Sequence, residues 1–206
     1  MLKIWGRINS INVQKVLWCC GELALPFERI DAGMQFGVNN TPEYLAMNPN
    51  GRVPTIDDDG FILWESQAIV RYLARKHGEG TLWPKDPRTC ADADRWMDWY
   101  SNTLWPNLQP IFWGLVRTPP EKRNMAEIEA ARKKVAESFA IVDAQLAKGA
   151  YMAGAAFSMG DIPMGVAAWR WFNLPIERPA HANLRRWYDA ICQRPAFKQH
   201  CALTLT

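Results

Sequence analysis

Residues 48–73 read NPNGRVPTIDDDGFILWESQAIVRYL, and this stretch decides the fold. Two strand-like runs, residues 53–56 and 61–64, flank an acidic turn that ends in Gly60, which predicts an antiparallel hairpin. Apolar side chains then recur at helical spacing over residues 66–76, which predicts a helix directly after the second strand. A hairpin and a closing helix are therefore expected to complete the first part of the chain.

The residues upstream of this stretch alternate between strand and helix signals. Residues 2–5 and 27–30 are short strand candidates, and between them residues 12–23 carry apolar side chains at helical spacing. A β-α-β unit of this length implies parallel strands with a right-handed crossover. With a short helical turn over residues 41–46, the predicted order is β-α-β-α-β-β-α.

Three segments are predicted along the whole chain. Residues 1–77 form the mixed α/β domain, and residues 78–88, rich in glycine and proline, form a linker. Residues 89–206 form an all-helical domain. The expected fold class is therefore α/β plus all-α, with a helical bundle in the C-terminal domain.

The helical part is predicted to contain one long and several shorter helices. Residues 90–116 are expected to form a long aromatic-rich helix that Pro106 and Pro110 kink or break. Residues 121–146 form a clean amphipathic helix. An S-x-x-D box at residues 158–161 is expected to begin the next helix. The last two helices are expected over residues 181–191 and 195–203.

The composition excludes several classes of protein. Of the 206 residues 49% are hydrophobic and 22% charged, which excludes intrinsic disorder. No apolar run reaches the ~20 residues of a membrane helix, and a net charge of +3 is too small to favour a nucleic-acid partner. The first seven residues lack the apolar run of a signal peptide, so a cytoplasmic protein is expected.

The cysteines and histidines indicate neither a disulfide framework nor a metal centre. Five cysteines at irregular spacing favour a reducing compartment. The three histidines have no metal-ligand spacing, so no metal is expected. Cys19 and Cys20 fall in the middle of a predicted helix and are interpreted as buried apolar side chains.

Three local features carry functional signals. Ser10 and Asn12 lie between the first strand and the first helix, residues 48–54 form a Pro-Asn-Gly loop, and Glu65 and Ser66 stand where the second hairpin strand meets a helix. Taken singly, each has a purely structural interpretation as a helix cap or a turn.

Taken together, in this order and spacing, the three features resemble the glutathione-binding half of cytosolic glutathione transferases. The resemblance covers essentially the whole chain, and the N-terminal serine with NPNGRVP is most similar to the bacterial theta- and nu-like groups. It implies a thioredoxin-like N-terminal domain and an all-helical domain. It also implies glutathione as co-substrate with no further cofactor.

The resemblance assigns parts of the γ-Glu-Cys-Gly tripeptide to individual residues. Ser66, at a helix N-terminus, is implied to bind the γ-glutamyl carboxylate, and Glu65 to pair with the ammonium group or to fix the turn. The Val53–Pro54 bond is expected to be cis, with the Val53 backbone paired to the cysteinyl residue like an added strand. For the glycyl end the candidates are Asn50 and Arg52, the latter equally well interpreted as a solvated surface charge.

The reacting group is the thiol, whose pKa of ~8.5 leaves only a few per cent ionised at pH 7. A lowering of about two units requires ~2.7 kcal/mol, which a hydroxyl donor and a helix N-terminus can supply. The family pattern places Ser10 beside the sulfur. Some nu-like members use an asparagine two residues later, which corresponds to Asn12, so the principal donor is left open between these two.

The resemblance implies that the second substrate, a small apolar electrophile or a disulfide, binds on the aromatic-rich helix, for which Trp105, Phe112 and Trp113 are candidates. A homodimer is also implied. Two alternatives remain beside conjugation: a nu-type glutathione-dependent disulfide reductase, and a non-catalytic ligand-binding or chaperone module on the same fold.

Overall fold

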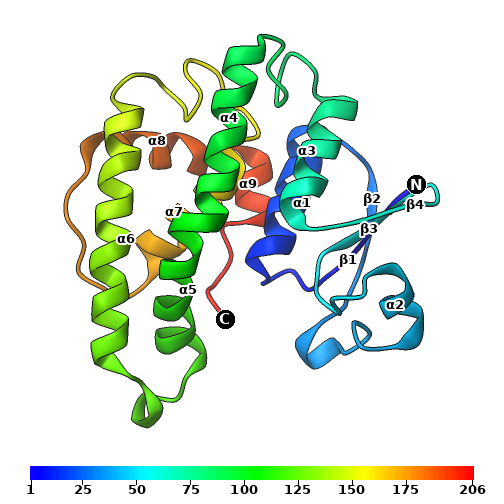
Figure 1. The fold of residues 1–206 in the computed structure, drawn as a ribbon, viewed down its shortest axis with the longest axis horizontal. Helices are drawn as coiled ribbons and strands as arrows, with labels where there is room; N and C mark the ends of the chain where they lie inside the picture. The colour runs from blue at the N-terminus through cyan, green and yellow to red at the C-terminus, as the bar shows by residue number, and fades with distance from the viewer. The chain divides into compact units, whose positions relative to one another are not determined.

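The computed structural model describes residues 1–206 (Figure 1). The chain divides into two compact units, which are described separately. Unit 1 comprises Met1–Trp83 and Pro195–Leu203, and unit 2 comprises Pro84–Arg194 and Thr204–Thr206. The division after Trp83 falls inside residues 78–88, the expected linker.

Unit 1 is built on a four-stranded mixed sheet of order β2-β1-β3-β4. The strands are β1 (Leu2–Trp5), β2 (Phe27–Ile30), β3 (Thr55–Asp58) and β4 (Phe61–Trp64). β1 is parallel to β2 and antiparallel to β3, and β3 and β4 form the predicted hairpin. The expected strand over residues 53–56 was placed two residues early, because the cis Val53–Pro54 bond lies in the loop and β3 starts at Thr55.

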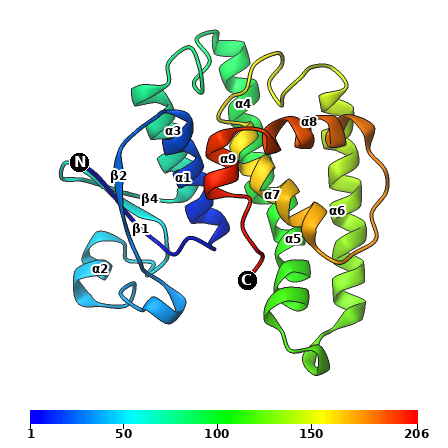
Figure 2. The same cartoon turned by 180° about the vertical axis from the view of Figure 1, so that it is seen from behind.

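Three helices complete the mixed α/β part of unit 1 and confirm the order β-α-β-α-β-β-α. They are α1 (Ile11–Glu22), α2 (Pro42–Met47) and α3 (Ser66–His77), and the short 3-10 helix η1 (Met34–Phe36) precedes α2. α1 and α3 pack side by side (Figures 1 and 2). Their apolar faces and the sheet form the core, in which Ile4, Ile56, Leu17 and Ile69 are all buried.

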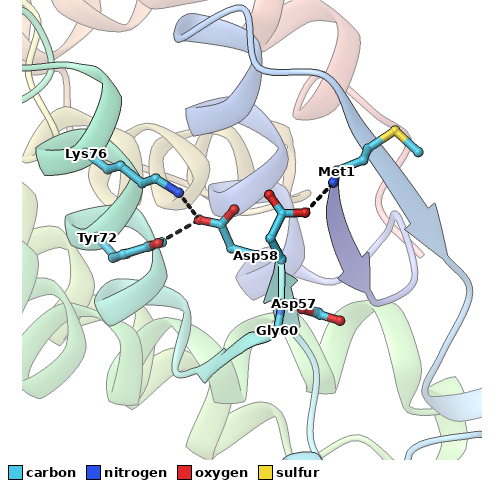
Figure 3. A network of polar contacts seen from close by, with 7 residues as sticks. Met1, Asp57, Asp58, Gly60, Tyr72 and Lys76 are labelled. Atoms are coloured by element: carbon cyan, nitrogen blue, oxygen red, sulfur yellow. Dashed lines mark hydrogen bonds and ion pairs between the residues drawn. The ribbon is translucent and has the colours of Figure 1, made fainter.

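The carboxylates of the acidic turn hold the hairpin in place through hydrogen bonds and ion pairs. Asp58 accepts hydrogen bonds from the Tyr72 hydroxyl at 2.6 Å and from Lys76 Nζ at 2.5 Å, which tie the hairpin to α3 (Figure 3). Lys76, and then Tyr72, hold the pKa of the Asp58 carboxyl below its usual range. Asp57 accepts a hydrogen bond from the Gly60 N–H at 2.6 Å, and the Met1 ammonium pairs with the carboxylate of Asp59, also at 2.6 Å.

The last helix, α9 (Pro195–His200), belongs to unit 1, although residues 89–206 were expected to form the helical domain. It packs against α1 in both views (Figures 1 and 2). The Phe197 ring meets Trp18 edge-on at 4.8 Å between ring centroids. Apolar periodicity alone did not reveal that the partner of this helix lies near the start of the chain.

Unit 2 is helical throughout, as predicted. Its helices are α4 (Pro87–Trp99), α5 (Trp105–Phe112), α6 (Met125–Leu146), α7 (Asp161–Asn173) and α8 (Ala182–Cys192), with a 3-10 turn η4 (Pro120–Lys122) before α6. None of the helices has the length and apolar character that a membrane-spanning segment requires.

The long helix expected over residues 90–116 is divided into α4 and α5 by a π-helical turn, η2 (Tyr100–Leu104), and a second π-turn, η3 (Trp113–Arg117), follows α5. Pro106 lies in the first turn of α5, where its missing N–H is tolerated. The π-turn lets Trp105 donate to the Tyr100 carbonyl five residues earlier, so the chain continues without a sharp break.

The S-x-x-D box at the start of α7 is present and fully buried. The Asp161 carboxylate accepts hydrogen bonds from the backbone N–H groups of Met152 (2.9 Å) and Ser158 (3.0 Å) and from Trp187 Nε1 (2.8 Å). Burial raises the pKa of Asp161 to about 6. Gly160 is required before it, because a Cβ there would lie 2.7 Å from the Ala93 carbonyl oxygen of α4.

Candidate functional site

The first predicted site segment is the start of α1, with Ser10 as its N-cap residue. The Ser10 side chain forms no capping hydrogen bond, whereas the N-cap side chains of Asp86 and Asn124 do. Ser10 is 7% exposed, and Asn12 is half-buried in the first helical turn. The purely structural interpretation of Ser10 as a side-chain cap is therefore wrong, and its hydroxyl is available to a ligand.

The second segment is the start of α3. Its N-cap residue Glu65 is exposed, has φ 71° and forms no side-chain cap, and Ser66 follows as a buried residue. Positive φ is strained for a glutamate, and such residues gather at functional sites. The uncapped N–H groups of the first turn, together with the helix dipole, can bind an anion.

The third segment is the loop of residues 48–54, which the buried side-chain amide of Asn48 holds in place. Asn48 Nδ2 donates to the Arg52 carbonyl at 2.8 Å and to the Thr55 hydroxyl at 3.0 Å. Tyr44 also donates to the Arg52 carbonyl, at 2.7 Å. This network was not predicted from the sequence, because it depends on the buried position of Asn48, which an Asn-Pro-Asn-Gly run does not reveal.

Within this loop, the Val53–Pro54 bond is cis, as predicted. Val53 is half-buried, and its backbone enters no backbone hydrogen bond outside the strands and helices. Asn50 and Arg52 are both exposed, and the Asn50 side chain donates to the Asn48 side-chain oxygen at 3.2 Å.

The register of the sheet brings the three segments together. Trp5 ends β1 and pairs with Thr55, the first residue of β3, which in turn pairs with Trp64, the last residue of β4. The chain leaves or enters the sheet at these three positions through the three segments just described. With strands ~4.8 Å apart, the three strand ends span about 10 Å at one end of the sheet. We call residues 7–12, 48–54 and 65–66 the sheet-end site.

Cys19 and Cys20 are not part of a nucleophilic site. Both are fully buried in α1, as predicted. Burial raises the pKa of Cys19 well above its usual value and that of Cys20 to about 12. Both thiols are therefore protonated at neutral pH, and protonated thiols are not nucleophilic.

The aromatic candidates for the second substrate differ in exposure within unit 2. Trp113 is 46% exposed and Phe112 is buried, with the Arg170 guanidinium 3.8 Å from the centre of its ring. Trp105 is half-buried and stacks on Tyr100 with 6.2 Å between ring centroids. Trp113 and Trp105 therefore offer accessible aromatic surface, whereas Phe112 belongs to the core of the unit.

These features define a class of protein: a thioredoxin-like domain with a cis-proline loop and an uncapped helix start at one end of its sheet, followed by a helical domain. Residues 1–75 match the family model of the glutathione S-transferase N-terminal domain, and residues 125–190 that of the glutathione S-transferase C-terminal domain.

Known relatives match along almost the whole chain. Glutathione S-transferase GstB of Escherichia coli K12 is 46% identical over 201 residues, 97% of each chain, and glutathione S-transferase 3 of Zea mays is 30% identical over 98% of this chain and 93% of its own. A crystal structure of the theta class glutathione S-transferase of Xanthomonas axonopodis pv. citri with glutathione bound superposes with a TM-score of 0.96 at 46% identity, covering 100% of this chain and 99% of that one. The chain belongs to the glutathione S-transferase family.

Proposed function

We propose that the sheet-end site binds glutathione and that its thiolate attacks an electrophilic carbon of a small apolar co-substrate. The observation that carries the proposal is the convergence of three segments, with an uncommitted Ser10 hydroxyl, at one end of the sheet. A tripeptide extended at ~3.3–3.6 Å per residue is about 10 Å long, which matches the ~10 Å between the three strand ends.

The proposed orientation follows from the charges of the tripeptide. The γ-glutamyl carboxylate meets the uncapped first turn of α3, where Ser66 supplies an N–H and a hydroxyl donor. Glu65 offers a carboxylate for the ammonium group. The Val53 backbone pairs with the cysteinyl residue, and Asn50 and Arg52 lie in the same exposed loop for the glycyl carboxylate.

The cysteinyl sulfur then reaches the start of α1. Ser10 donates a hydrogen bond to the thiolate, and Asn12, two residues later in the first turn of α1, is the alternative donor. The uncapped N-terminus of the 12-residue α1 adds a positive dipole end. These groups favour the thiolate, so nucleophile is present at neutral pH. In the transfer, the sulfur forms a bond to the electrophilic carbon as the leaving group departs with its electron pair.

The acceptor is a small apolar electrophile, for which Trp105 and Trp113 offer accessible aromatic surface within unit 2. Turnover with a chloronitrobenzene is expected, and it falls in the Ser10→Ala variant. Turnover confined to a dialkyl disulfide would instead indicate a glutathione-dependent disulfide reductase. No turnover with either class, but retained binding of glutathione, would indicate a binding module. No further cofactor and a cytoplasmic location form part of the proposal.

We further propose that the chain forms a homodimer through a groove of unit 2 between α4 and α6. The groove has a volume of about 530 Å³ and presents Trp96 and Trp99 beside Ile141, which is 53% exposed. Lys148 and Arg95 line the same groove, and Arg95 also forms an ion pair with Asp92 at 2.6 Å.

A complementary surface lies on the hairpin of unit 1. Phe61 is 50% exposed beside the acidic turn, and its ring rests on Tyr72 at 5.1 Å between centroids. The exposed carboxylate of Asp59 lies two residues from Phe61. An exposed aromatic side chain on one copy matches an apolar aromatic groove on another.

A further inference from the structure

Arg7 was not singled out from the sequence, yet the structure builds it into the sheet-end site. Its backbone N–H donates to the Ala32 carbonyl at 3.0 Å, and its carbonyl accepts from the Ser10 N–H at 3.2 Å. The residue is therefore fixed between the end of β2 and the N-cap of α1. The next backbone group on the strand side is fixed as well, because the Gly6 N–H donates to the Ile30 carbonyl at 2.8 Å.

The side chain of Arg7 crosses from this loop towards the cis-proline loop. A Cβ added at Gly33 would lie 3.2 Å from Arg7 Nη1 and 3.4 Å from Val53 Cγ2. The guanidinium and the Val53 side chain therefore border the same small space above Gly33. Gly33 itself has φ 88°, so both the backbone conformation and the lack of room require glycine here.

Arg7 thus lies between two segments of the sheet-end site, the start of α1 and the cis-proline loop. The proposed function assigns the cysteinyl residue of glutathione to both of them. The Arg7 backbone carbonyl holds the N–H of Ser10, the residue assigned to the sulfur. Its guanidinium borders the same space above Gly33 as the side chain of Val53, the residue assigned to the cysteinyl backbone. A positive charge in this place favours the thiolate of the cysteinyl residue over the thiol, because an opposite charge within a few ångströms favours the ionised form.

We propose that Arg7 is a positioning residue for the glutathione thiolate: it fixes the N-cap turn that carries Ser10 and supplies a permanent positive charge that favours the thiolate. This inference rests on the proposed binding of glutathione at the sheet-end site. An arginine suits this task because it stays charged at every pH at which the thiol titrates.

Other charged groups flank the site and contribute to its field. Arg29 donates to the Gly6 carbonyl at 2.9 Å and forms an ion pair with Asp31, so these two charges largely compensate each other. The segments themselves carry the exposed Arg52 and Glu65, and α1 carries Lys15, buried one turn from its start. The three heavy atoms nearest to a Cβ at Gly33 belong to Arg7 and Val53.

The test is an ultraviolet titration of the thiolate of bound glutathione in three variants. In Arg7→Gln the pKa of the bound thiol is expected to rise by about one unit, the lower end of the 1–3 units typical of a close opposite charge. Turnover below the thiol pKa falls about tenfold to match. Arg7→Lys keeps the charge and most of the effect. Lys3→Gln removes the same charge from an exposed position within β1 and leaves the titration unchanged.

Two further readouts separate this inference from its alternatives. The shift in Arg7→Gln must persist with the dipeptide γ-Glu-Cys, which lacks the glycyl carboxylate. Suppose instead that Arg7→Gln binds glutathione more weakly, binds γ-Glu-Cys as well as the unchanged protein does, and leaves the thiol pKa unchanged. This result would show that Arg7 binds the glycyl carboxylate, and it would overturn the inference. An unchanged titration in a folded Arg7→Gln variant that still binds glutathione would overturn it too, and leave the proposed function standing. Failure of the unchanged protein to bind glutathione in calorimetry would overturn both.

Discussion

Replacing Ser10 by alanine removes the hydroxyl of the N-cap residue of α1, and the structure separates the two expected consequences. Loss of an N-cap side chain usually costs about 0.5–2 kcal/mol of stability. The Ser10 side chain forms no capping hydrogen bond, so this cost does not arise. We expect the free energy of unfolding of Ser10→Ala to stay within ~0.5 kcal/mol of the unchanged protein, as for a substitution that breaks no contact.

The effect on the bound thiol is expected to be large. A hydrogen bond to a charged group contributes about 1.5–3 kcal/mol, and here it acts on the thiolate but hardly on the thiol. At 1.36 kcal/mol per unit, the pKa of the bound thiol should rise by about 1–2 units. Turnover at pH 6.5 should then fall about 10- to 100-fold with little change in glutathione affinity, because the lost contact favours the charged form selectively.

The matched control is Asp86→Ala at the N-cap of α4, where the carboxylate accepts hydrogen bonds from the Thr89 N–H at 2.8 Å and the Thr89 hydroxyl at 2.7 Å. This variant should lose about 0.5–2 kcal/mol of stability, and the pKa of the bound thiol should stay unchanged. Ultraviolet titration and urea unfolding of both variants decide the matter. The reasoning would be refuted if Ser10→Ala unfolded at a lower urea concentration than the unchanged protein while the pKa of the bound thiol stayed the same. A larger shift in Asn12→Ala than in Ser10→Ala would transfer the principal role to Asn12.

Three other predictions concern binding, stability and assembly. Ser66→Ala and Glu65→Ala should each weaken glutathione binding about 10- to 150-fold in calorimetry, and unchanged affinity would remove the γ-glutamyl group from α3. Because burial raises the folded pKa of Asp161 to about 6, above its ordinary 3.8, the folded state holds this proton more tightly. The stability that Asp161 contributes should therefore fall as the pH rises from about 4 to 6, and the difference in urea unfolding between the unchanged protein and Asp161→Asn should show this slope. Phe61→Asp should convert the dimer to monomers in light scattering, and a dimer that persists would exclude the hairpin from the interface.

The sequence predicted the architecture of unit 1 well because its signals are local. The acidic turn ending in Gly60 and the alternation of strand and helix periods each depend on a few neighbouring residues. Docking of α9 on α1 is different, since Phe197 meets Trp18 across almost the whole chain. An interruption of the long helix was predicted from Pro106 and Pro110, but neither proline specifies a π-turn from Tyr100 to Leu104.

For the site, the sequence identified the segments but not the groups that hold them in place. Ser10 and Ser66 were named from their positions between a strand and a helix. The supporting role of Asn48 depends on its burial and on the Arg52 carbonyl and Thr55 hydroxyl that it binds. Arg7 stands in a short loop where a surface charge is the ordinary interpretation, and only the distances to Gly33 reveal where its guanidinium lies.

The central claim is that the three segments at one end of the sheet hold glutathione with its sulfur on Ser10. A crystal structure of this protein with glutathione bound tests it most directly. The account predicts the sulfur within hydrogen-bond distance of Ser10 Oγ, the γ-glutamyl carboxylate on the Ser66 N–H, and the cysteinyl backbone paired with Val53. A tripeptide bound away from these segments, or a sulfur held by neither Ser10 nor Asn12, would contradict the account.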